Sequence, residues 1–201
     1  VLGRKFIDFP SDKDRMYRVL GRISRFQRTR GSKQIQSRWS YARRMNKELA
    51  RKISSAITEY AGQNHADVIA FEHLEMSGKQ SGKRKQRLHL WKKQDIQNLC
   101  EHQAYRKGIR ISRICAWNTS RLAYDGTGEV VRDSKNHSLC TFTTGKRYHC
   151  DLSAAYNIGA RYIIKELIKV LPNIMTEVSN IGGGTSRTLS TLWNINSVMV
   201  I

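Results

Sequence analysis

The sequence predicts a mixed α/β fold, and the order of its apolar patterns carries that prediction. An apolar run at residues 67–74 is followed by a helical pattern at about 92–107 and by a second apolar run at 109–117. This order is typical of two parallel strands joined by a right-handed helical crossover. Two long helical patterns precede this unit and one follows it, and 201 residues suffice for one full domain with a helical insertion.

The two helical patterns at the start predict an antiparallel hairpin over residues 12–62. Residues 4–9 read as a short strand that stops at Pro10, and a capping box then starts a first helix over about 12–29. After a Gly-Ser break, apolar residues recur at helical spacing up to about residue 62. On the second helix, the residues predicted to be buried are Trp39, Ala42, Met45, Leu49, Ile53, Ala56 and Tyr60.

The charge distribution indicates a polyanionic partner. The chain has 36 Lys and Arg against 16 Asp and Glu, a net charge of +20. Residues 1–52 carry 16 of these cations and four acids, and residues 76–94 carry seven cations and no acid. Nucleic acid is the first candidate for such a surface. A membrane is disfavoured, because it would need an amphipathic helix with a clean basic face and bulky apolar residues opposite.

Exposed arginines of the hairpin are therefore expected to contact phosphates, since too few acids lie nearby to pair with them. The polar stretch at 77–87 reads as a basic loop that steers a single strand of nucleic acid. The predicted phosphate contacts are Arg22, Arg25, Arg28, Arg43, Arg44, Lys79, Lys83, Arg84, Lys85 and Arg87.

Two carboxylates stand where phosphodiester chemistry could use them. Glu72 lies inside the apolar run at 67–74, and a carboxylate on a strand buried on both faces is costly to desolvate without a partner or a cation. Asp151 precedes a helix expected over about 152–170. Two-metal hydrolysis needs about three or four carboxylates that converge from different elements. A structural role, such as a helix cap for Asp151, explains each residue equally well when it is taken alone.

The residues around both carboxylates resemble segments of the RuvC-like nucleases of the transposon TnpB type, also called OrfB-family transposases. Residues 69–74 (IAFEHL) resemble the second RuvC segment, in which a strand ends in Glu. Residues 151–158 (DLSAAYNI) match the third segment, Asp-x-x-Ala-Ala-x-Asn-Ile, at every specified position. Asn118-Thr119-Ser120 falls where that family has a Thr-Ser motif. The resemblance covers about residues 1–170.

The resemblance implies an RNase H-like (RuvC) fold and a magnesium-dependent endonuclease that cuts DNA. Glu72 and Asp151 would be the catalytic metal ligands, with Mg²⁺ or Mn²⁺ as the cofactor, and Ser120 would contact nucleic acid. In that family a guide RNA selects the DNA target, the gene travels with transposons, and type V CRISPR effectors are relatives. The expected location is the cytoplasm, in association with the nucleoid.

The sequence departs from the family at its zinc knuckle. The family has two Cys-x-x-Cys pairs ahead of the last Asp, whereas the corresponding residues here are Leu122, Asp125, Cys140 and Thr143. One thiol cannot hold zinc, so no zinc is expected. Turn-forming residues at 125–128 and 143–146 predict a hairpin-rich insertion over 118–150 in place of the knuckle. The four cysteines are too scattered for a disulfide framework and are expected to be reduced.

A second departure is the missing first RuvC segment, so the predicted fold lacks its first strands. Nothing in the chain matches apolar-Gly-Ile-Asp-x-Gly, and Asp8 is a weak candidate because Pro10 and a helix follow it directly. We expect the first carboxylate upstream of Val1, and little or no cutting by this chain alone. The predicted domain plan is a RuvC-like core part at 1–117, the insertion, a final helix at 151–171 and a tail at 172–201 without an assigned role.

Two alternatives remain open at this point. One is a nuclease-inactive relative kept for RNA-guided DNA binding or repression. The other is a ribosomal or structural RNA-binding protein, for which the charge alone would serve. Salt dependence of binding does not separate them, because all three classes neutralise phosphates.

Overall fold

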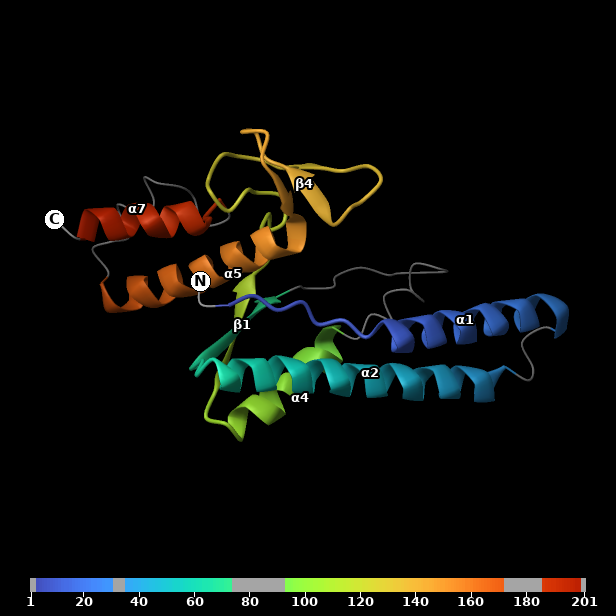
Figure 1. Ribbon diagram of the computed structural model, residues 1–201. Helices are drawn as coiled ribbons and strands as arrows, with labels where there is room; N and C mark the ends of the chain where they lie inside the picture. The colour runs from blue at the N-terminus through green and yellow to red at the C-terminus, as the bar shows by residue number, and fades with distance from the viewer. Residues whose placement is uncertain (1–2, 31–34, 74–92, 172–185, 200–201) are drawn as a thin grey trace. The chain divides into compact units, whose positions relative to one another are not determined.

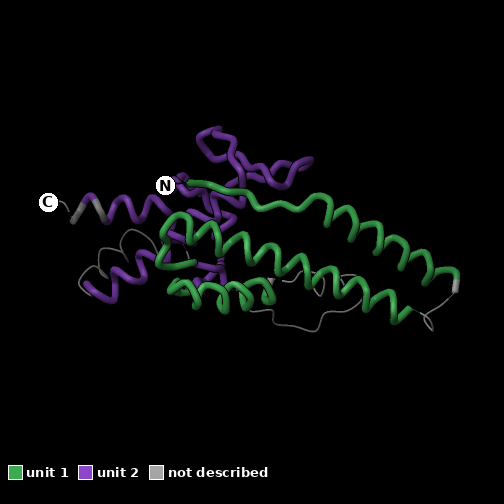
Figure 2. The backbone as a smooth tube through the Cα atoms, turned by 60° about the horizontal axis from the view of Figure 1, so that its bottom comes forward, with its two compact units in different colours: residues 1–69, 77–111 green, residues 70–76, 112–201 purple. Residues whose placement is uncertain are grey.

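The computed structural model describes residues 3–30, 35–73, 93–171 and 186–199. Its contacts divide the chain into two compact units, which Figure 2 colours separately: unit 1 comprises residues 1–69 and 77–111, and unit 2 comprises residues 70–76 and 112–201. The predicted basic loop at 77–87, with Lys79, Lys83, Arg84, Lys85 and Arg87, lies outside the described residues. Its contacts with nucleic acid therefore stay a prediction.

Unit 1 begins with the predicted helical hairpin. Helices α1 (Pro10–Arg30) and α2 (Gln36–Gln63) lie side by side and antiparallel (Figure 1). The hairpin core consists of buried and half-buried apolar side chains from both helices, as their periodicity predicted. Its members are Met16, Val19, Leu20, Ile23, Phe26, Ile35, Trp39 and Ala42.

The strand predicted at residues 4–9 is wrong, because these residues have no regular structure. Pro10 is instead the first residue of α1, where its fixed φ fits the helix and its missing N–H costs nothing. Asp8 forms an ion pair with Lys13, and its carboxylate accepts a hydrogen bond from the Phe9 N–H at 2.9 Å. The Lys13 hydrogen bond holds the pKa of Asp8 below its ordinary value. Asp8 therefore has a partner at the start of a helix.

Helix α4 (Lys93–Tyr105) packs against α2 through small and polar side chains. The Thr58 hydroxyl donates to the Gln103 side-chain oxygen at 2.9 Å, and the Gln103 amide donates to the Ser54 hydroxyl at 3.4 Å. The buried face of α2 therefore differs from the predicted apolar face, of which only Ala42 is fully buried. Its buried residues recur mainly at four-residue spacing, namely Ala42, Asn46, Ala50, Ser54, Thr58 and Ala61.

One strand precedes α4 in the sequence and one follows it, which is the order that the predicted crossover requires. They are β1 (Val68–His73) and β2 (Arg110–Cys115), and they are hydrogen-bonded neighbours in a two-stranded sheet. The prediction that the first strand is buried on both faces is wrong, because β1 is half-buried from Val68 to Glu72 and exposed at His73. A sheet with two described strands has few neighbours to cover its faces.

Unit 2 contains a small antiparallel sheet of strands β3 (Val131–Arg132), β4 (Leu139–Thr141) and β5 (Arg147–His149). A tight turn at 142–146 joins β4 to β5, and a bridge between Leu122 and Glu129 closes the turn at 125–128. Both predicted hairpin turns are confirmed. The buried centre of this region is Ala123, Cys140, Phe142 and Cys150, with Tyr124, Val130 and Tyr148 packed against it.

Helices α5 (Cys150–Val170) and α7 (Leu189–Met199) lie side by side in unit 2 (Figure 1). Ile164 and Ile195 are fully buried between them, with Ile168 and Leu192 alongside. The sequence assigned no structure or role to residues 172–201, so α7 is a helix that the prediction missed. None of the helices in the described residues is long and apolar enough to cross a membrane.

Candidate functional site

Asp151 is the second residue of α5, directly after the hairpin sheet. The helix N-cap is His149, so the cap role that the sequence left open for Asp151 is not the role it has. Its side chain is exposed, and among the described residues no hydrogen bond or ion pair engages its carboxylate. The first turn of a helix is a favourable place for a negative charge, because the backbone N–H groups there point toward it.

Glu72 is the fifth of six residues in β1 and is half-buried. It belongs to the same compact unit as Asp151, because residues 70–76 group with residues 112–201. The desolvation argument for Glu72 is weaker than the sequence suggested, since the strand around it keeps contact with solvent. The role of Glu72 as a partner of Asp151 stays a prediction.

The described residues contain no group of three or more His, Cys, Asp or Glu side chains that could hold a metal ion. Carboxylate oxygens such as those of Glu72 and Asp151 are nevertheless the ligands that Mg²⁺ prefers. The chemistry of this donor pair therefore fits Mg²⁺, but its number falls below that of a complete two-metal site. The further carboxylate, expected upstream of Val1, stays a prediction.

Asn157, the Asn of the third segment, is fully buried and joins three parts of unit 2. Its side-chain amide donates to the backbone carbonyl of Thr119 at 3.0 Å and to that of Leu122 at 2.9 Å. Its side-chain oxygen accepts from the backbone N–H of Leu189, at the start of α7, at 3.2 Å. The amide is thus fully used within the protein and is not available to a substrate.

Two further polar residues of α5 support the same region. The buried Ser153 hydroxyl accepts from the Tyr124 N–H at 3.2 Å and lies 3.4 Å from the carbonyl of Leu122, to which it donates. Arg161 is 6% exposed, and its guanidinium donates to the backbone carbonyls of Cys115, Trp117 and Arg187 at 2.8–3.0 Å. Burial lowers the pKa of Arg161 from its ordinary value. The Ser153 bonds hold the first turn of α5 against residues 122–124, and the Arg161 bonds hold the middle of the helix against the end of β2.

Sequence reasoning missed Arg161 and α7 as parts of this support. Apolar spacing in the sequence predicts a buried face made of Leu152, Ala155, Ile158, Tyr162, Leu167 and Leu171. The structure instead buries Cys150, Ser153, Asn157, Ala160, Arg161 and Ile164. A signal for α7 exists in the sequence: Thr188 and Thr191 stand at capping-box spacing, and the Thr188 N–H donates to the Thr191 hydroxyl at 3.1 Å.

The described basic residues lie where the sequence placed them. Arg22, Arg25 and Arg28 are exposed on α1, and Arg43 and Arg44 are exposed on α2. Ser120 is half-buried in the turn after β2, next to Thr119, whose carbonyl binds Asn157. Contact of any of these residues with nucleic acid stays a prediction.

The positive charge is concentrated in one of the two units. Unit 1 contains 26 Lys and Arg against 8 Asp and Glu, a net charge of +18. Unit 2 contains 10 against 8, a net charge of +2. The candidate metal ligands thus belong to a nearly neutral unit, and the helical hairpin belongs to a strongly basic one.

Comparisons with known proteins identify a shared fold. No protein-family model matches the sequence, and a search of curated proteins finds no match. Among solved structures, the mixed α/β fold is similar to part of C2c1 from Alicyclobacillus acidoterrestris, which was solved in complex with single-guide RNA. The TM-score is 0.51 with 16% sequence identity, over 80% of this chain and 20% of the C2c1 chain. The similarity therefore spans about a fifth of that protein.

Proposed function

We propose that this chain is the C-terminal part of a RuvC-like endonuclease that cuts DNA with magnesium under the guidance of an RNA, of the transposon-associated OrfB type. The observation that carries the proposal is the state of Asp151. Within a motif whose Ser153 and Asn157 side chains are hydrogen-bonded inside the protein, this carboxylate is exposed in the first turn of the helix and has no partner among the described residues.

Two further observations support the proposal. The fold is similar to part of C2c1, a type V effector that was solved with a guide RNA, which makes RNA a reasonable partner. Unit 1 carries a net charge of +18, which suits a nucleic acid with its phosphates.

Asp151 and Glu72 would hold the magnesium ion together with a carboxylate from outside the described residues. Magnesium supplies the charge that stabilises the attacking and leaving oxygens at phosphorus. This chain would supply two of the carboxylate ligands from separate elements, Glu72 from β1 and Asp151 from α5. The bonds of Ser153, Asn157 and Arg161 hold the first three turns of α5 in place.

The test is a cleavage assay on single-stranded and RNA-complementary DNA, with the whole protein, its RNA and Mg²⁺ or Mn²⁺. Cleavage is expected to depend on the metal and to be lost in Asp151→Ala and Glu72→Ala. Asp133→Ala is the matched control, because Asp133 is a carboxylate of the same unit that holds a loop turn instead. Full activity of Asp151→Ala would remove the assignment.

A second function is RNA-guided binding of DNA without cutting, which the net charge of +18 on unit 1 would serve without a metal site. This second function replaces the first if the whole protein with its RNA binds only DNA complementary to that RNA and leaves the DNA uncut in both Mg²⁺ and Mn²⁺.

A further inference from the structure

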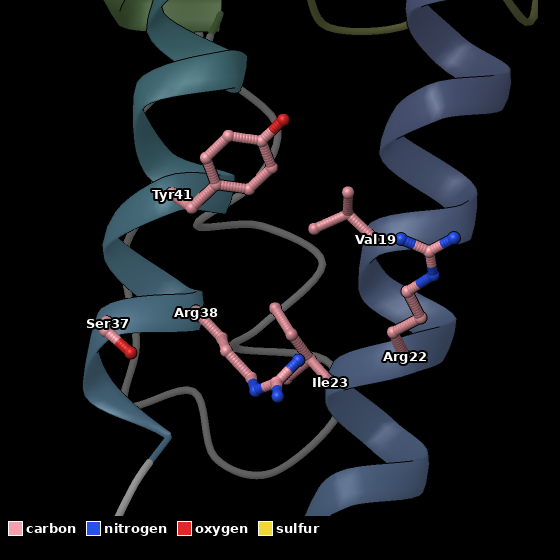
Figure 3. A pocket seen from close by; sticks show the side chains of 6 residues that line it. All are labelled: Val19, Arg22, Ile23, Ser37, Arg38 and Tyr41. Atoms are coloured by element: carbon pink, nitrogen blue, oxygen red, sulfur yellow. The ribbon is translucent and has the colours of Figure 1, made fainter.

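A pocket of about 250 Å³ lies within the helical hairpin of unit 1, between α1 and α2. Val19, Arg22 and Ile23 line it from α1, and Ser37, Arg38 and Tyr41 line it from α2. Figure 3 shows Tyr41 and Arg38 reaching from α2 toward Val19 and Ile23 of α1. The walls are thus aliphatic and aromatic, and the polar groups are two guanidinium groups and two hydroxyl groups.

The aromatic wall and one of the arginines are held in place by neighbours outside the pocket. The Arg15 guanidinium donates to the Tyr41 hydroxyl at 2.7 Å, which fixes the ring. The Arg38 guanidinium stacks over the Phe26 ring, 4.5 Å from its centroid. Tyr41 nevertheless remains 37% exposed, so its ring is accessible to a ligand. A positioned ring beside fixed cations binds a flat, aromatic ligand that carries negative charge.

We propose that this pocket takes one unstacked base of a single-stranded nucleic acid, with Tyr41 stacking on the base and Arg22 and Arg38 contacting the adjacent phosphates or the base edge. The inference rests on the nucleic-acid partner of the proposed function and names where a base is held. A phosphate alone fits less well, because it would use the two guanidinium groups but leave the aliphatic and aromatic walls without a partner. The unit's net charge of +18 favours a polyanion over an uncharged aromatic ligand.

The test measures binding of short fluorescent strands to the full chain by anisotropy. Three probes of equal length are titrated: an RNA strand, a DNA strand of the same sequence and a strand in which every base is replaced by an abasic site. Tyr41→Ala is expected to weaken binding of the better base-containing strand about fivefold or more. It is expected to leave binding of the abasic strand unchanged, because the charges of the protein are unaltered.

Matched variants separate stacking from other effects. Tyr41→Phe keeps the ring but loses the hydrogen bond from Arg15, so it should weaken binding much less than Tyr41→Ala. Tyr17→Ala removes an 80% exposed tyrosine of the same hairpin that does not line the pocket, and it should change nothing. Arg38→Gln should weaken binding of base-containing strands more than Arg18→Gln, which removes an exposed charge outside the pocket. Circular dichroism checks that each variant keeps its helices.

Equal losses for the abasic and base-containing strands in Tyr41→Ala, or no loss for either, would overturn the pocket and leave the nuclease proposal standing. The expected base-dependent loss in a whole protein that never cuts DNA would support the pocket and remove the nuclease proposal. A preference for the RNA or for the DNA strand identifies which nucleic acid supplies the base.

Discussion

At the scale of single residues, helix α5 holds two kinds of polar group with opposite uses. Asn157, Ser153 and Arg161 are buried and bonded to backbone groups of neighbouring segments. Asp151, in the first turn of the same helix, is exposed and unengaged among the described residues. The buried amide and guanidinium bonds hold the backbone of α5 against neighbouring segments, which leaves the Asp151 side chain free to turn toward a ligand.

Asn157→Ala is expected to destabilise unit 2 by about 2–4 kcal/mol, because buried backbone groups of Thr119, Leu122 and Leu189 lose their partner. The free energy of unfolding in urea measures this. Asn194→Ala, an exposed Asn on α7, is the control and should cost little. A loss for Asn157→Ala no larger than that of the control would contradict the structural role of this amide.

The cysteines provide a second prediction at this scale. Burial raises the pKa of Cys100 and of Cys140 to about 12. Between about pH 9 and 12 the folded state keeps these protons while the unfolded state loses them, so the free energy of unfolding falls as the pH rises through this window. In the folded protein at pH 8, a thiol reagent should label the exposed Cys115 quickly and these two slowly. Equal rates would contradict their burial.

At the scale of elements, the sequence predicts those whose pattern comes from apolar side chains alone. The hairpin helices, α4, β2 and α5 were found because apolar residues recur at regular spacing or form a run. Two buried faces were predicted wrongly. On α2 the buried row is small and polar, including Ser54 and Thr58, and on α5 it includes Asn157 and Arg161. A hydropathy pattern predicts that such polar residues are exposed to solvent, because it takes no account of hydrogen-bond partners that are distant in the sequence.

Helix α7 was missed for a related reason. The contacts that stabilise it are made with other segments of the chain and do not show in its own residue pattern. Ile195 packs on Ile164, and the Ser190 N–H donates to the Tyr124 carbonyl at 3.0 Å. The site was predictable to the extent that a motif singles out Asp151. The surrounding bonds were not predictable, because they join residues about 30 to 50 positions apart.

The contact between the 125–128 turn and α7 makes Gly126 the position to test. Gly126 and Gly145 have the same left-handed backbone conformation, with φ of 81° and 82°. A Cβ added to Gly126 would clash with the Ser190 side chain, whereas a Cβ added to Gly145 would have no atom within 4 Å. Gly145→Ala should cost about 1 kcal/mol from backbone strain. Gly126→Ala should cost a further 1–3 kcal/mol, roughly, from the clash.

Thermal unfolding of both variants measures the difference. Ser190→Ala should recover part of the stability of Gly126→Ala and none of that of Gly145→Ala. Equal losses for the two glycine variants would show that the turn does not approach α7 as the structure has it.

At the scale of the whole molecule, charge and chemistry divide between the two units. Unit 1 has almost all of the net charge, +18 of +20, and no candidate catalytic residue, whereas unit 2 has Glu72 and Asp151 at a net charge of +2. A strong positive potential beside the carboxylates would compete with a metal cation for them. Under the proposed function, this division would let one unit bind phosphates while the carboxylates of the other keep their affinity for a cation.

This division predicts which charges set the salt dependence of binding. Each phosphate of a single strand that the protein neutralises contributes about 0.7 to the slope of log K against log salt. Replacing Arg25, Arg28 and Arg44 of unit 1 with Gln should therefore reduce the slope by up to about 2. The same change at the exposed Arg132, Lys135 and Lys165 of unit 2 should leave the slope almost unaltered, although the net charge falls by the same amount.

Titrations of one labelled strand at several salt concentrations give both slopes. If the slope falls equally in the two triple variants, the strand responds to total charge, and the hairpin is not its binding surface.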